Sequence, residues 1–463
     1  MACDLCNCLL RNLYLIFSSI AKPRLQSLLL AFYFVILFLA KDYIFNAVEL
    51  LFSGKHEFVR HQPHRDLIQI QVIFKHGHRS PFRLYKTDPN PKELWSEGLG
   101  QLTKLGRLQL YVMGDHLKKR YSHLISSNPN EMEMMSSNAS RSMYSAYCFL
   151  AGMYPPDEEW AFAEIPWQPI PVLYVPEEED MHLQSNPNCP KYEEVKRRLT
   201  KSEEVLRFVG QYKTFYEFVH NKSGSPCSTF EGAGDVYKTL SVEGDSNLTI
   251  PEWAVQSWDE LIHQTDVGYY WHFATKVQHR LRGGPILGLI FDRMKSRIDG
   301  EHKDIKVYGY SGHGSNVAAI QCALLLYDMK HAPHAATIVF ELYRDYQDNY
   351  SVRFVLFNST HPERRLEEPF VFKLHGCDEY CPIESFERFI KPIVPHDWRK
   401  ECAERDDSEK DYVPIQYAEC VNPRKELTSA AALTNHNFIL TIGFVLITSF
   451  ISVIDNKLFY LNL

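Results

Sequence analysis

Basic and imidazole side chains follow three apolar runs of the chain, and a helical pattern comes after each of them. The runs are residues 67–74, 131–136 and 305–310. The side chains that follow them are Lys75, His76, His78, Arg79, Arg141 and His313. Clustered nitrogen donors near helix N-termini favour an anion, and phosphate is the natural candidate. The alternative for the first stretch is a solvated turn that is basic without a function.

The elements that must hold these side chains alternate between strand and helix. The three apolar runs have the pattern of strands, and helices are expected over residues 102–120, 141–154, 286–294 and 317–328. We therefore predict an α/β fold with a doubly wound, mainly parallel sheet flanked by helices. Ligands bind outside the carboxyl ends of such strands, so the three basic strand ends are expected to converge.

Residues 166–284 interrupt this alternation. Short proline-rich connections there accompany two helical runs, 192–216 and 253–281. The pattern predicts an inserted, mainly helical subdomain. Whether this subdomain takes part in function or only covers the core is left open by the sequence.

Apolar segments near both ends predict attachment to a membrane. Residues 27–40 follow a basic stretch, which is the charge order of a signal anchor or a signal peptide. Residues 438–454 carry no charge, which favours a transmembrane helix, with a lipid-anchor signal as the alternative. The expected domains are a cytosolic N-terminus with the first segment over 1–55, a luminal or extracellular domain over 56–427, and the second segment within 428–463.

The charge balance excludes one class of partner. The 463 residues include 50 basic and 57 acidic side chains, for a net charge of −7, and both signs are mixed along the chain. No basic field is present that would attract nucleic acid. The sequence does not fix the oligomeric state, and a homodimer is one option.

Cysteine and sequon positions agree with a secretory compartment. Cys377 and Cys381 are close enough in sequence for a local disulfide, whereas a zinc site there would need a second ligand pair that the chain lacks. Glycosylation sequons occur at Asn138, Asn221, Asn247, Asn349 and Asn358. A glycan on Asn138 would crowd the strand end that leads to Arg141, so we expect the other four asparagines to be the acceptors.

Three motifs resemble those of the histidine acid phosphatases, in the branch of the lysosomal and prostatic acid phosphatases. KHGHRSP (75–81) is similar to the family's RHGxRxP signature, SRSMYSAYCFLAGMYPP (140–156) to its downstream arginine motif, and YSGHGSN (310–316) to its YSAHDTT. Longer counterparts extend the resemblance over about residues 66–402.

The resemblance implies hydrolysis of a phosphate monoester, on a small molecule or a protein, without a cofactor. His76 would be the nucleophile and would form a phosphohistidine. Arg79 and Arg141 would bind the phosphate oxygens, and His313 would add a further donor. A rival zinc site, built from His76, His78 and His313, is disfavoured by the two neighbouring arginines.

The resemblance also bears on the compartment. It implies disulfides between Cys189 and Cys402 and between Cys377 and Cys381, in a membrane-anchored glycoprotein of the lysosomal lumen or the cell surface. The family's third disulfide is missing, and Thr337 occupies one of its expected positions.

Two positions depart from the family pattern. Lys75 stands where the family has Arg, so a point charge replaces a planar fork. Gly314 stands where the family has the Asp of its HD pair, and this removes the carboxylic acid that would protonate the leaving oxygen. General acid catalysis is typically worth about 10² to 10⁴ in rate, so we expect slow hydrolysis. The alternative is an inactive phosphate-binding glycoprotein of the same fold.

Two groups are candidates to stand in for the missing acid. His78 lies within the first motif, at a position that the family leaves variable, and an imidazole titrates within reach of an acidic lumen. His396 and Asp397 form a second HD dipeptide, although the resemblance places it in the C-terminal part of the domain. As alternatives to these roles, His78 would be an ordinary loop residue and the dipeptide would lie away from the site.

Overall fold

The computed structural model describes residues 65–404, which belong to a compact unit that begins at Arg65. The apolar segments 27–40 and 438–454 lie outside the described residues, and so do the predicted domain boundaries near 55 and 427. Among the residues that are described, no helix combines the length and the apolar character that crossing a membrane requires.

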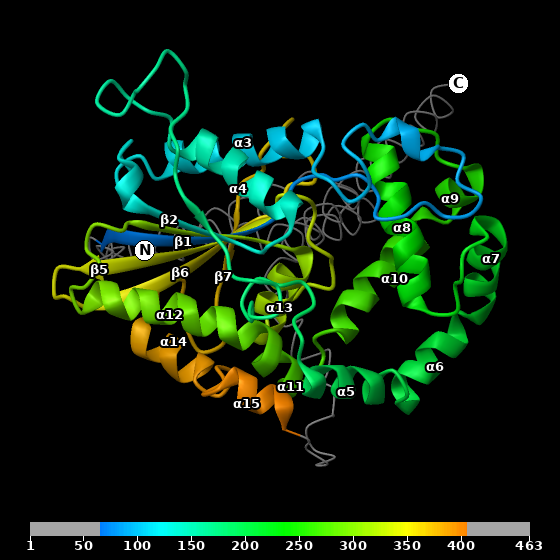
Figure 1. Cartoon of the computed structure of the whole chain (residues 1–463). Helices are drawn as coiled ribbons and strands as arrows, with labels where there is room; N and C mark the ends of the chain where they lie inside the picture. The colour runs from blue at the N-terminus through cyan, green and yellow to red at the C-terminus, as the bar shows by residue number, and fades with distance from the viewer. Residues whose placement is uncertain (1–64, 405–463) are drawn as a thin grey trace, which may run out of the picture. The chain divides into compact units, whose positions relative to one another are not determined.

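A mixed β-sheet forms the centre of the unit (Figure 1). Its strands are β1 (Arg65–Lys75), β2 (Met132–Ser136), β3 (Val172–Leu173), β4 (Val307–Gly312), β5 (Thr337–Asp345), β6 (Tyr350–Phe357), β7 (Phe370–Phe372) and β8 (Cys381–Pro382). The order across the sheet is β3-β2-β4-β1-β5-β6-β7, and β8 pairs with β6. The β3-β2-β4-β1 half is parallel, whereas every pairing from β1–β5 onward is antiparallel.

The predicted α/β class is confirmed, and all three predicted strands exist as β1, β2 and β4. The prediction of a mainly parallel sheet describes only one half, because β5 to β8 were not anticipated. Since β2, β4 and β1 are parallel neighbours, their carboxyl ends lie at the same edge. The expected convergence of the three strand ends is therefore present in the topology.

The central strand β1 is buried on both faces. Ile70, Val72 and Phe74 point into the core on one side, and Ile73 points into the core on the other. The polar positions between them are also buried, and Gln71 illustrates how they are satisfied: its amide donates to the Ile290 carbonyl at 2.8 Å. A strand enclosed in this way has little freedom to move its end, which is where Lys75 and His76 lie.

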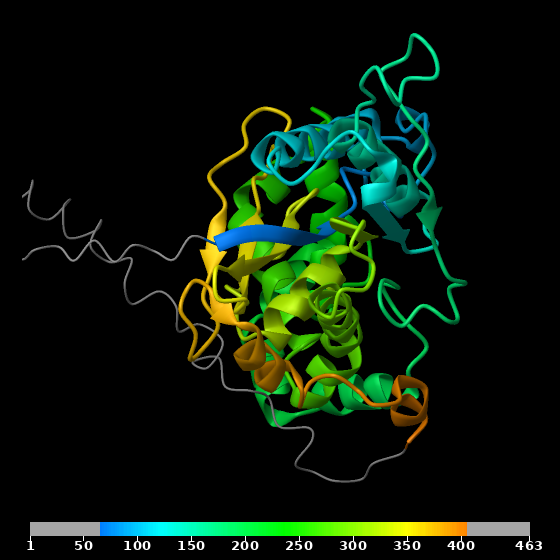
Figure 2. The same ribbon diagram turned by 90° about the vertical axis from the view of Figure 1, so that its left-hand side faces the viewer.

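Helices cover both faces of the sheet in separate layers (Figure 2). One face packs against α3 (Lys104–Arg120) and α4 (Ser140–Met153), and the other against α12 (Gly284–Ile298), α13 (Gly314–Ala323) and α14 (Ile383–Ile390), with α15 (Trp398–Ala403) beyond them. The predicted helices correspond to α3, α4, α12 and α13, with shifts of a few residues at their ends.

The remaining helices gather to one side as the predicted helical subdomain (Figure 1). They are α5 (Pro190–Leu199), α6 (Glu203–Gln211), α7 (Lys213–Ser223), α8 (Phe230–Asp245), α9 (Glu252–Gln256), α10 (Trp258–Trp271) and α11 (Lys276–Gln278). The long run predicted over 192–216 is divided among α5, α6 and α7. Helix α8 was not anticipated, because its three glycines weaken the helical signal in the sequence. Packing against α10 stabilises the helix despite these glycines.

Both predicted disulfides are present. Cys189–Cys402 joins the start of α5 to α15, and Cys377–Cys381 closes the loop before β8. At the position where the family's third disulfide is expected, Thr337 is a buried residue of β5 whose hydroxyl donates to the Ala335 carbonyl at 2.8 Å. The Thr337 hydroxyl is therefore buried with its hydrogen bond satisfied, and the fold tolerates the loss of the disulfide at this position.

The loop that follows β1 is fastened to helix α8 by polar contacts. The Thr239 hydroxyl donates to the Arg83 carbonyl at 3.0 Å, and the Arg83 guanidinium pairs with Asp235. Glu243 of α8 is completely buried beside Asp88 of the loop. Burial, and then the charge of Asp88, raises the pKa of Glu243 to about 8. The carboxyl group of Glu243 is therefore mostly protonated in the folded protein at neutral pH.

We expect Glu243→Gln to weaken the dependence of stability on pH. Folded Glu243 keeps its proton up to about pH 8, whereas an ordinary unfolded Glu loses it near pH ~4.3. The folded state thus holds more protons between these values, and the free energy of unfolding falls as pH rises through that window. Urea unfolding at pH 5 and pH 8 measures the change, with the exposed Glu217→Gln as the control. Equal pH dependence in wild type and Glu243→Gln would contradict the assignment.

Candidate active site

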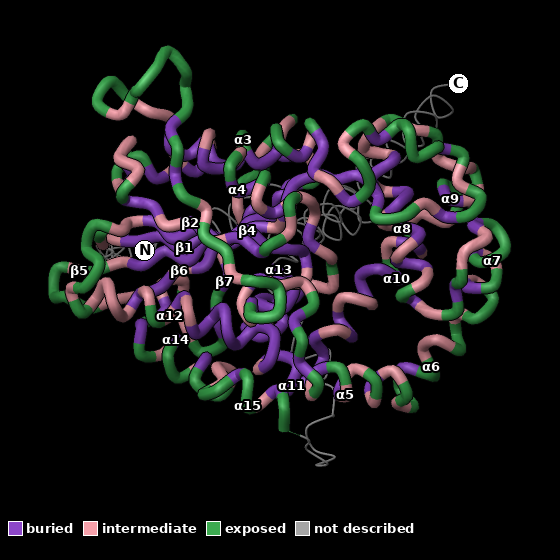
Figure 3. Tube along the Cα trace, viewed as in Figure 1, coloured by how far each residue is buried: buried purple, intermediate pink, exposed green. Residues whose placement is uncertain are grey.

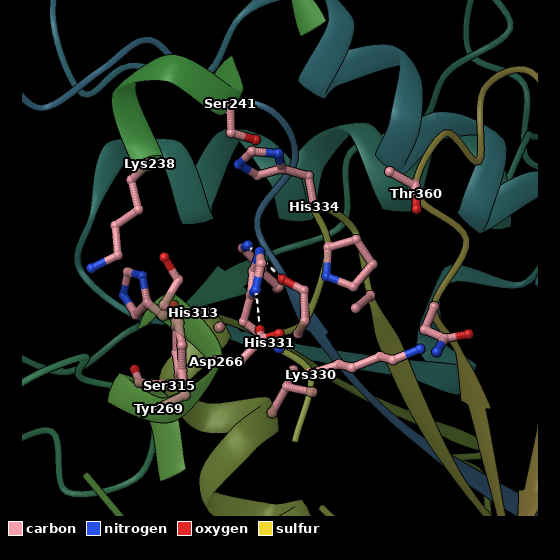
Figure 4. A pocket seen from close by; sticks show the side chains of 18 of the residues that line it. Lys238, Ser241, Asp266, Tyr269, His313, Ser315, Lys330, His331, His334 and Thr360 are labelled. Atoms are coloured by element: carbon pink, nitrogen blue, oxygen red, sulfur yellow. Dashed lines mark hydrogen bonds and ion pairs between the residues drawn. The ribbon is translucent and has the colours of Figure 1, made fainter. Parts of the chain in front are cut away.

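A cavity of about 800 Å³ lies outside the carboxyl ends of β1 and β4 (Figure 4). One wall comes from the strand ends and the start of α13, with Lys75, His76, Arg79 and His313 among the lining residues. The opposite wall comes from α8 and α10 of the helical subdomain, and residues 328–336 complete it. Four of the residues that the sequence singles out are therefore brought together.

His76 follows β1 directly and is almost completely buried. Its Nδ1 lies 2.9 Å from the Gly77 carbonyl, and because a carbonyl only accepts, Nδ1 must carry the ring proton. Nε2 is then left with a lone pair. Burial lowers the pKa of His76 well below its ordinary value, and the charges of His313 and Arg141 act in the same direction. The lowered pKa favours the neutral form of the imidazole.

Glycine is required beside His76 by close packing. A Cβ on Gly77 would lie 2.2 Å from the Gly106 carbonyl oxygen of α3, which is far inside contact distance. The Gly77 amide also donates to the Ser145 hydroxyl of α4 at 3.1 Å. The loop thus rests directly on the two helices that cover this face of the sheet, and its backbone position is fixed.

The guanidinium groups of Arg79 and Arg141 meet at one aromatic ring. Their central carbons lie 3.8 Å and 4.9 Å from the ring centroid of Phe82. Burial, and then the charge of Arg141, lowers the pKa of Arg79 to about 10, and burial lowers the pKa of Arg141 as well. The two cations repel each other, and an anion bound between them would offset this repulsion.

Lys75 adds a third cation to the cavity. Its ammonium group donates to the Ala332 carbonyl at 2.8 Å. Burial, followed by the charges of Arg79 and Lys238, lowers the pKa of Lys75 to about 7, against a smaller opposing effect of Asp245. At acid pH the side chain is charged and suited to attract an oxyanion, as a point charge without the paired donors of an arginine.

His313 is held between Ser137 and Arg141. Its Nδ1 lies 3.4 Å from an Arg141 nitrogen that can only donate, so the ring proton is on Nε2, which donates to the Ser137 hydroxyl at 3.0 Å. Burial, and then Arg141, lowers the pKa of His313 to about 3. In this arrangement His313 orients Arg141, and it can donate to a ligand only after its ring turns.

His78 does not line the cavity. Both its ring nitrogens are engaged, Nδ1 with the Thr103 hydroxyl at 2.8 Å and Nε2 with the Val242 carbonyl at 3.1 Å. Burial lowers the pKa of His78 to about 4. The arrangement favours a structural role, in which His78 links the loop after β1 to α8, over the predicted role as a stand-in acid.

The second HD dipeptide also lies away from the cavity. Asp397 precedes α15 and accepts the Lys400 amide at 3.1 Å, and His396 with Asp397 lines a different surface depression beside Arg280. Neither side chain belongs to the cavity that contains His76. This placement favours the alternative in which the dipeptide has no part in the site.

Gly314 begins α13 and lines the cavity. A Cβ built on it would lie 3.1 Å from the Tyr269 hydroxyl oxygen and 3.4 Å from Cδ of Lys75. The place where the family pattern has an Asp is therefore surrounded by these two side chains.

Among residues 65–404, no group of three His, Cys, Asp or Glu side chains is arranged to hold a metal ion.

The helical subdomain supplies cavity residues that sequence reasoning missed. They are Tyr237, Lys238, Ser241, Val242 and Asp245 of α8, and Trp258, Ile262, Thr265, Asp266 and Tyr269 of α10. Their spacing of three to four residues places them on one face of each helix, which is the signal that could have found them. The subdomain therefore does more than cover the core.

The segment before β5 supplies two further imidazoles. His334 is half-buried, with its ring 6.0 Å from that of His76 and 5.2 Å from that of His78, measured between centroids. His331 binds Asp266, with 2.5 Å between Nδ1 and the carboxylate oxygen (Figure 4). The sequence HAPHAA carries both residues, but nothing in it indicates which strand end the segment would face.

The predicted glycan acceptors Asn221, Asn247, Asn349 and Asn358 are all exposed. Figure 3 shows the exposed segments in green and the buried strands of the sheet in purple. Asn358 also lines the cavity, so a glycan there would stand at the wall of the site. Asn138, which we expected to remain unmodified, is exposed as well.

These features define a class of protein. It is an α/β protein in which histidines, two arginines and a lysine gather at the carboxyl edge of the sheet. Residues 66–357 match the family model of the histidine phosphatase superfamily (branch 2), and the chain belongs to this family.

Individual relatives agree with this assignment. The chain is 33% identical to lysosomal acid phosphatase of Xenopus laevis over 346 residues, which cover 73% of this chain and 79% of that protein. It is 32% identical to prostatic acid phosphatase of Bos taurus over 352 residues, 74% of this chain and 89% of that protein. The crystal structure of the phytase from Citrobacter braakii superposes with a TM-score of 0.58 at 16% identity, covering 73% of this chain and 99% of the phytase, which shows the fold alone.

The lowered pKa of Lys75 predicts that anion binding depends on pH. Sulfate keeps one charge state between pH 5.5 and pH 8.5, whereas Lys75 loses its proton near pH 7. We expect sulfate affinity to fall by about tenfold over this range, since a charge-assisted hydrogen bond is worth roughly 1.5 kcal/mol or more. Calorimetric titration measures the affinity.

Lys75→Met is the informative variant for this prediction. It should bind sulfate weakly at both pH values, and the exposed Lys92→Met should behave as wild type. An unchanged pH dependence in Lys75→Met would show that another group is responsible.

Proposed function

We propose that the protein hydrolyses phosphate monoesters through a phosphohistidine on His76. The observation that carries the proposal is the 2.9 Å contact between His76 Nδ1 and the Gly77 carbonyl, because it requires the proton on Nδ1 and would leave Nε2 free to attack. The relatives that cover most of the chain are named acid phosphatases. Substrates of this reaction would be small-molecule or protein phosphate monoesters.

The first step would transfer the phosphoryl group to the enzyme. A nitrogen–phosphorus bond forms at Nε2 of His76 while the bond from phosphorus to the ester oxygen breaks. Arg79, Arg141 and Lys75 would neutralise the charge on the remaining phosphoryl oxygens. In the second step water attacks phosphorus, the bond to His76 breaks, and inorganic phosphate leaves. The loop packing around Gly77 keeps the nucleophile in place through both steps.

The absence of a carboxylic acid at Gly314 would make the rate depend on the leaving group. An aryl oxide departs readily, whereas an alkoxide needs a proton as it leaves. Slow turnover of alkyl phosphates is therefore part of the proposal. The same observation supports a second candidate function, a phosphoester-binding glycoprotein of this fold that has lost turnover.

The relatives and the chain's own cysteines support a compartment of the secretory pathway. Lysosomal and prostatic acid phosphatases suggest the secretory pathway, and the two disulfides fit an oxidising compartment. Anchoring through residues 27–40 or 438–454, and placement in the lysosomal lumen or at the cell surface, complete the proposal.

The direct test compares the full-length protein with His76→Ala on an aryl phosphate and on glycerol phosphate at pH 5. We expect wild type to hydrolyse the aryl ester and the variant to lose at least about 10³-fold, since the nucleophile is removed. Acid quench of wild type should trap a phosphorylated imidazole. Equal rates in the two proteins would eliminate the enzyme and favour the binding protein.

Gly314→Asp tests whether the missing acid limits the rate. An added Cβ fits with a small displacement of Tyr269 and Lys75, because the nearest atoms are the end of one side chain and the stem of another. Turnover of glycerol phosphate should rise by about 10²-fold at pH 5, and aryl phosphate turnover should change much less. No change on either ester would place the limitation elsewhere, with Lys75 as the next position to examine.

A further inference from the structure

One polar atom lies at the place that the missing carboxylic acid would occupy. The Tyr269 hydroxyl oxygen is 3.1 Å from the Cβ position of Gly314, nearer than any other heavy atom outside the adjoining residues. Tyr269 comes from α10 and lines the same cavity as His76 (Figure 4). No hydrogen bond of its hydroxyl is found among residues 65–404, and the side chain is half-buried in the cavity wall.

The aromatic ring of Tyr269 is held in position by an imidazole–carboxylate pair. Its ring is nearly parallel to that of His331, with an angle of 14° and 6.1 Å between centroids. Asp266, one helical turn before Tyr269, accepts both the His331 amide at 2.7 Å and its Nδ1 at 2.5 Å. Asp266 thus holds His331 in place, and the Tyr269 ring stacks on the His331 ring.

Two cationic side chains, Lys75 and Arg79, lie in this part of the cavity. Cδ and Cε of Lys75 lie 3.4 Å and 3.5 Å from the same Cβ position. The phenol of Tyr269 is also near enough to Arg79 to interact with it electrostatically. Positive charge near the phenol would offset the negative charge that remains when its proton moves to the leaving oxygen.

We propose that Tyr269 is the proton donor to the leaving group, in place of the missing carboxylic acid. As the bond between phosphorus and the ester oxygen breaks, the Tyr269 proton moves to that oxygen, the alcohol leaves neutral, and the phenolate remains beside Lys75. In the second step the phenolate takes a proton from the attacking water. Hydrolysis of the phosphohistidine then returns Tyr269 to its starting form. This inference rests on the proposed function.

A phenol predicts a different pH profile from a carboxylic acid. An ordinary carboxylic acid loses its proton below pH 5, whereas a phenol keeps its proton through neutral pH. Hydrolysis of alkyl phosphates by wild type should therefore stay within about threefold between pH 5 and pH 7. A carboxylic acid donor would instead give a steep decline over this range.

The decisive variant is Tyr269→Phe in the full-length protein, because it removes the hydroxyl and keeps the ring against His331. We expect glycerol phosphate turnover to fall by about 10²-fold, and p-nitrophenyl phosphate turnover by less than about threefold, since a nitrophenolate needs no proton to leave. Sulfate binding should equal that of wild type, which shows that the fold and the anion site are intact. Tyr237→Phe, which removes another hydroxyl from the cavity wall, should leave the ratio of the two turnover rates unchanged.

Rescue separates donation from structure. Gly314→Asp combined with Tyr269→Phe should recover glycerol phosphate turnover at pH 5 and introduce the decline toward pH 7 that a carboxylic acid produces. An equal loss on both esters in Tyr269→Phe would overturn the proposal, and so would a ratio of rates identical to wild type. If wild type shows no turnover that depends on His76, the proposed function fails together with this inference. If such turnover is present and Tyr269→Phe leaves the ratio unchanged, only the proton donor is wrong.

Discussion

Mutual repulsion among nitrogen-bearing side chains is the constraint on which this structure depends. Lys75, Arg79 and Arg141 are gathered with the imidazoles of His76 and His313, and each shows a lowered pKa. Within residues 65–404 no carboxylate forms an ion pair with any of the three cations. Lys75 and Arg79 instead donate to the backbone carbonyls of Ala332 and Ser80, and Arg141 donates to a ring nitrogen of His313. Carbonyl oxygens fix the geometry without cancelling the charge, so the site stays complementary to an anion.

The sheet with its helices and the helical subdomain enclose these charged side chains from opposite sides. The sheet and the helices packed on it hold His76 through a buried strand and a loop in direct contact with α3 and α4. The helical subdomain closes the cavity from the opposite side with α8 and α10. His78 joins the two, since its ring connects Thr103, which caps α3, to the Val242 carbonyl of α8. A residue suspected of catalysis thus keeps the two walls at a fixed separation.

The residues of the site that lie close to a strand end could be predicted from the sequence. The apolar patterns of β1, β2 and β4 can be recognised in the sequence, and residues that follow β1 and β4 line the cavity. Tyr269, Asp266 and His331 could not be found in the same way, because they join the site only through the packing of α10 and of the segment before β5. The antiparallel half of the sheet was missed for a related reason. β5 and β6 follow one another as a hairpin whose position beside β1 is decided by tertiary pairing.

The two departures from the family pattern are linked by charge. An Asp at position 314 would place a carboxylate against the stem of Lys75, and its charge would hold a neighbouring cation in its protonated form. With Gly314 that compensation is gone, and an arginine at position 75 would keep its charge at every physiological pH. A lysine can release its proton, and burial with the neighbouring cations lowers its pKa to about 7. Lys75 therefore lets the empty cavity shed one charge near neutral pH and take it back when an anion or an acidic solution favours it.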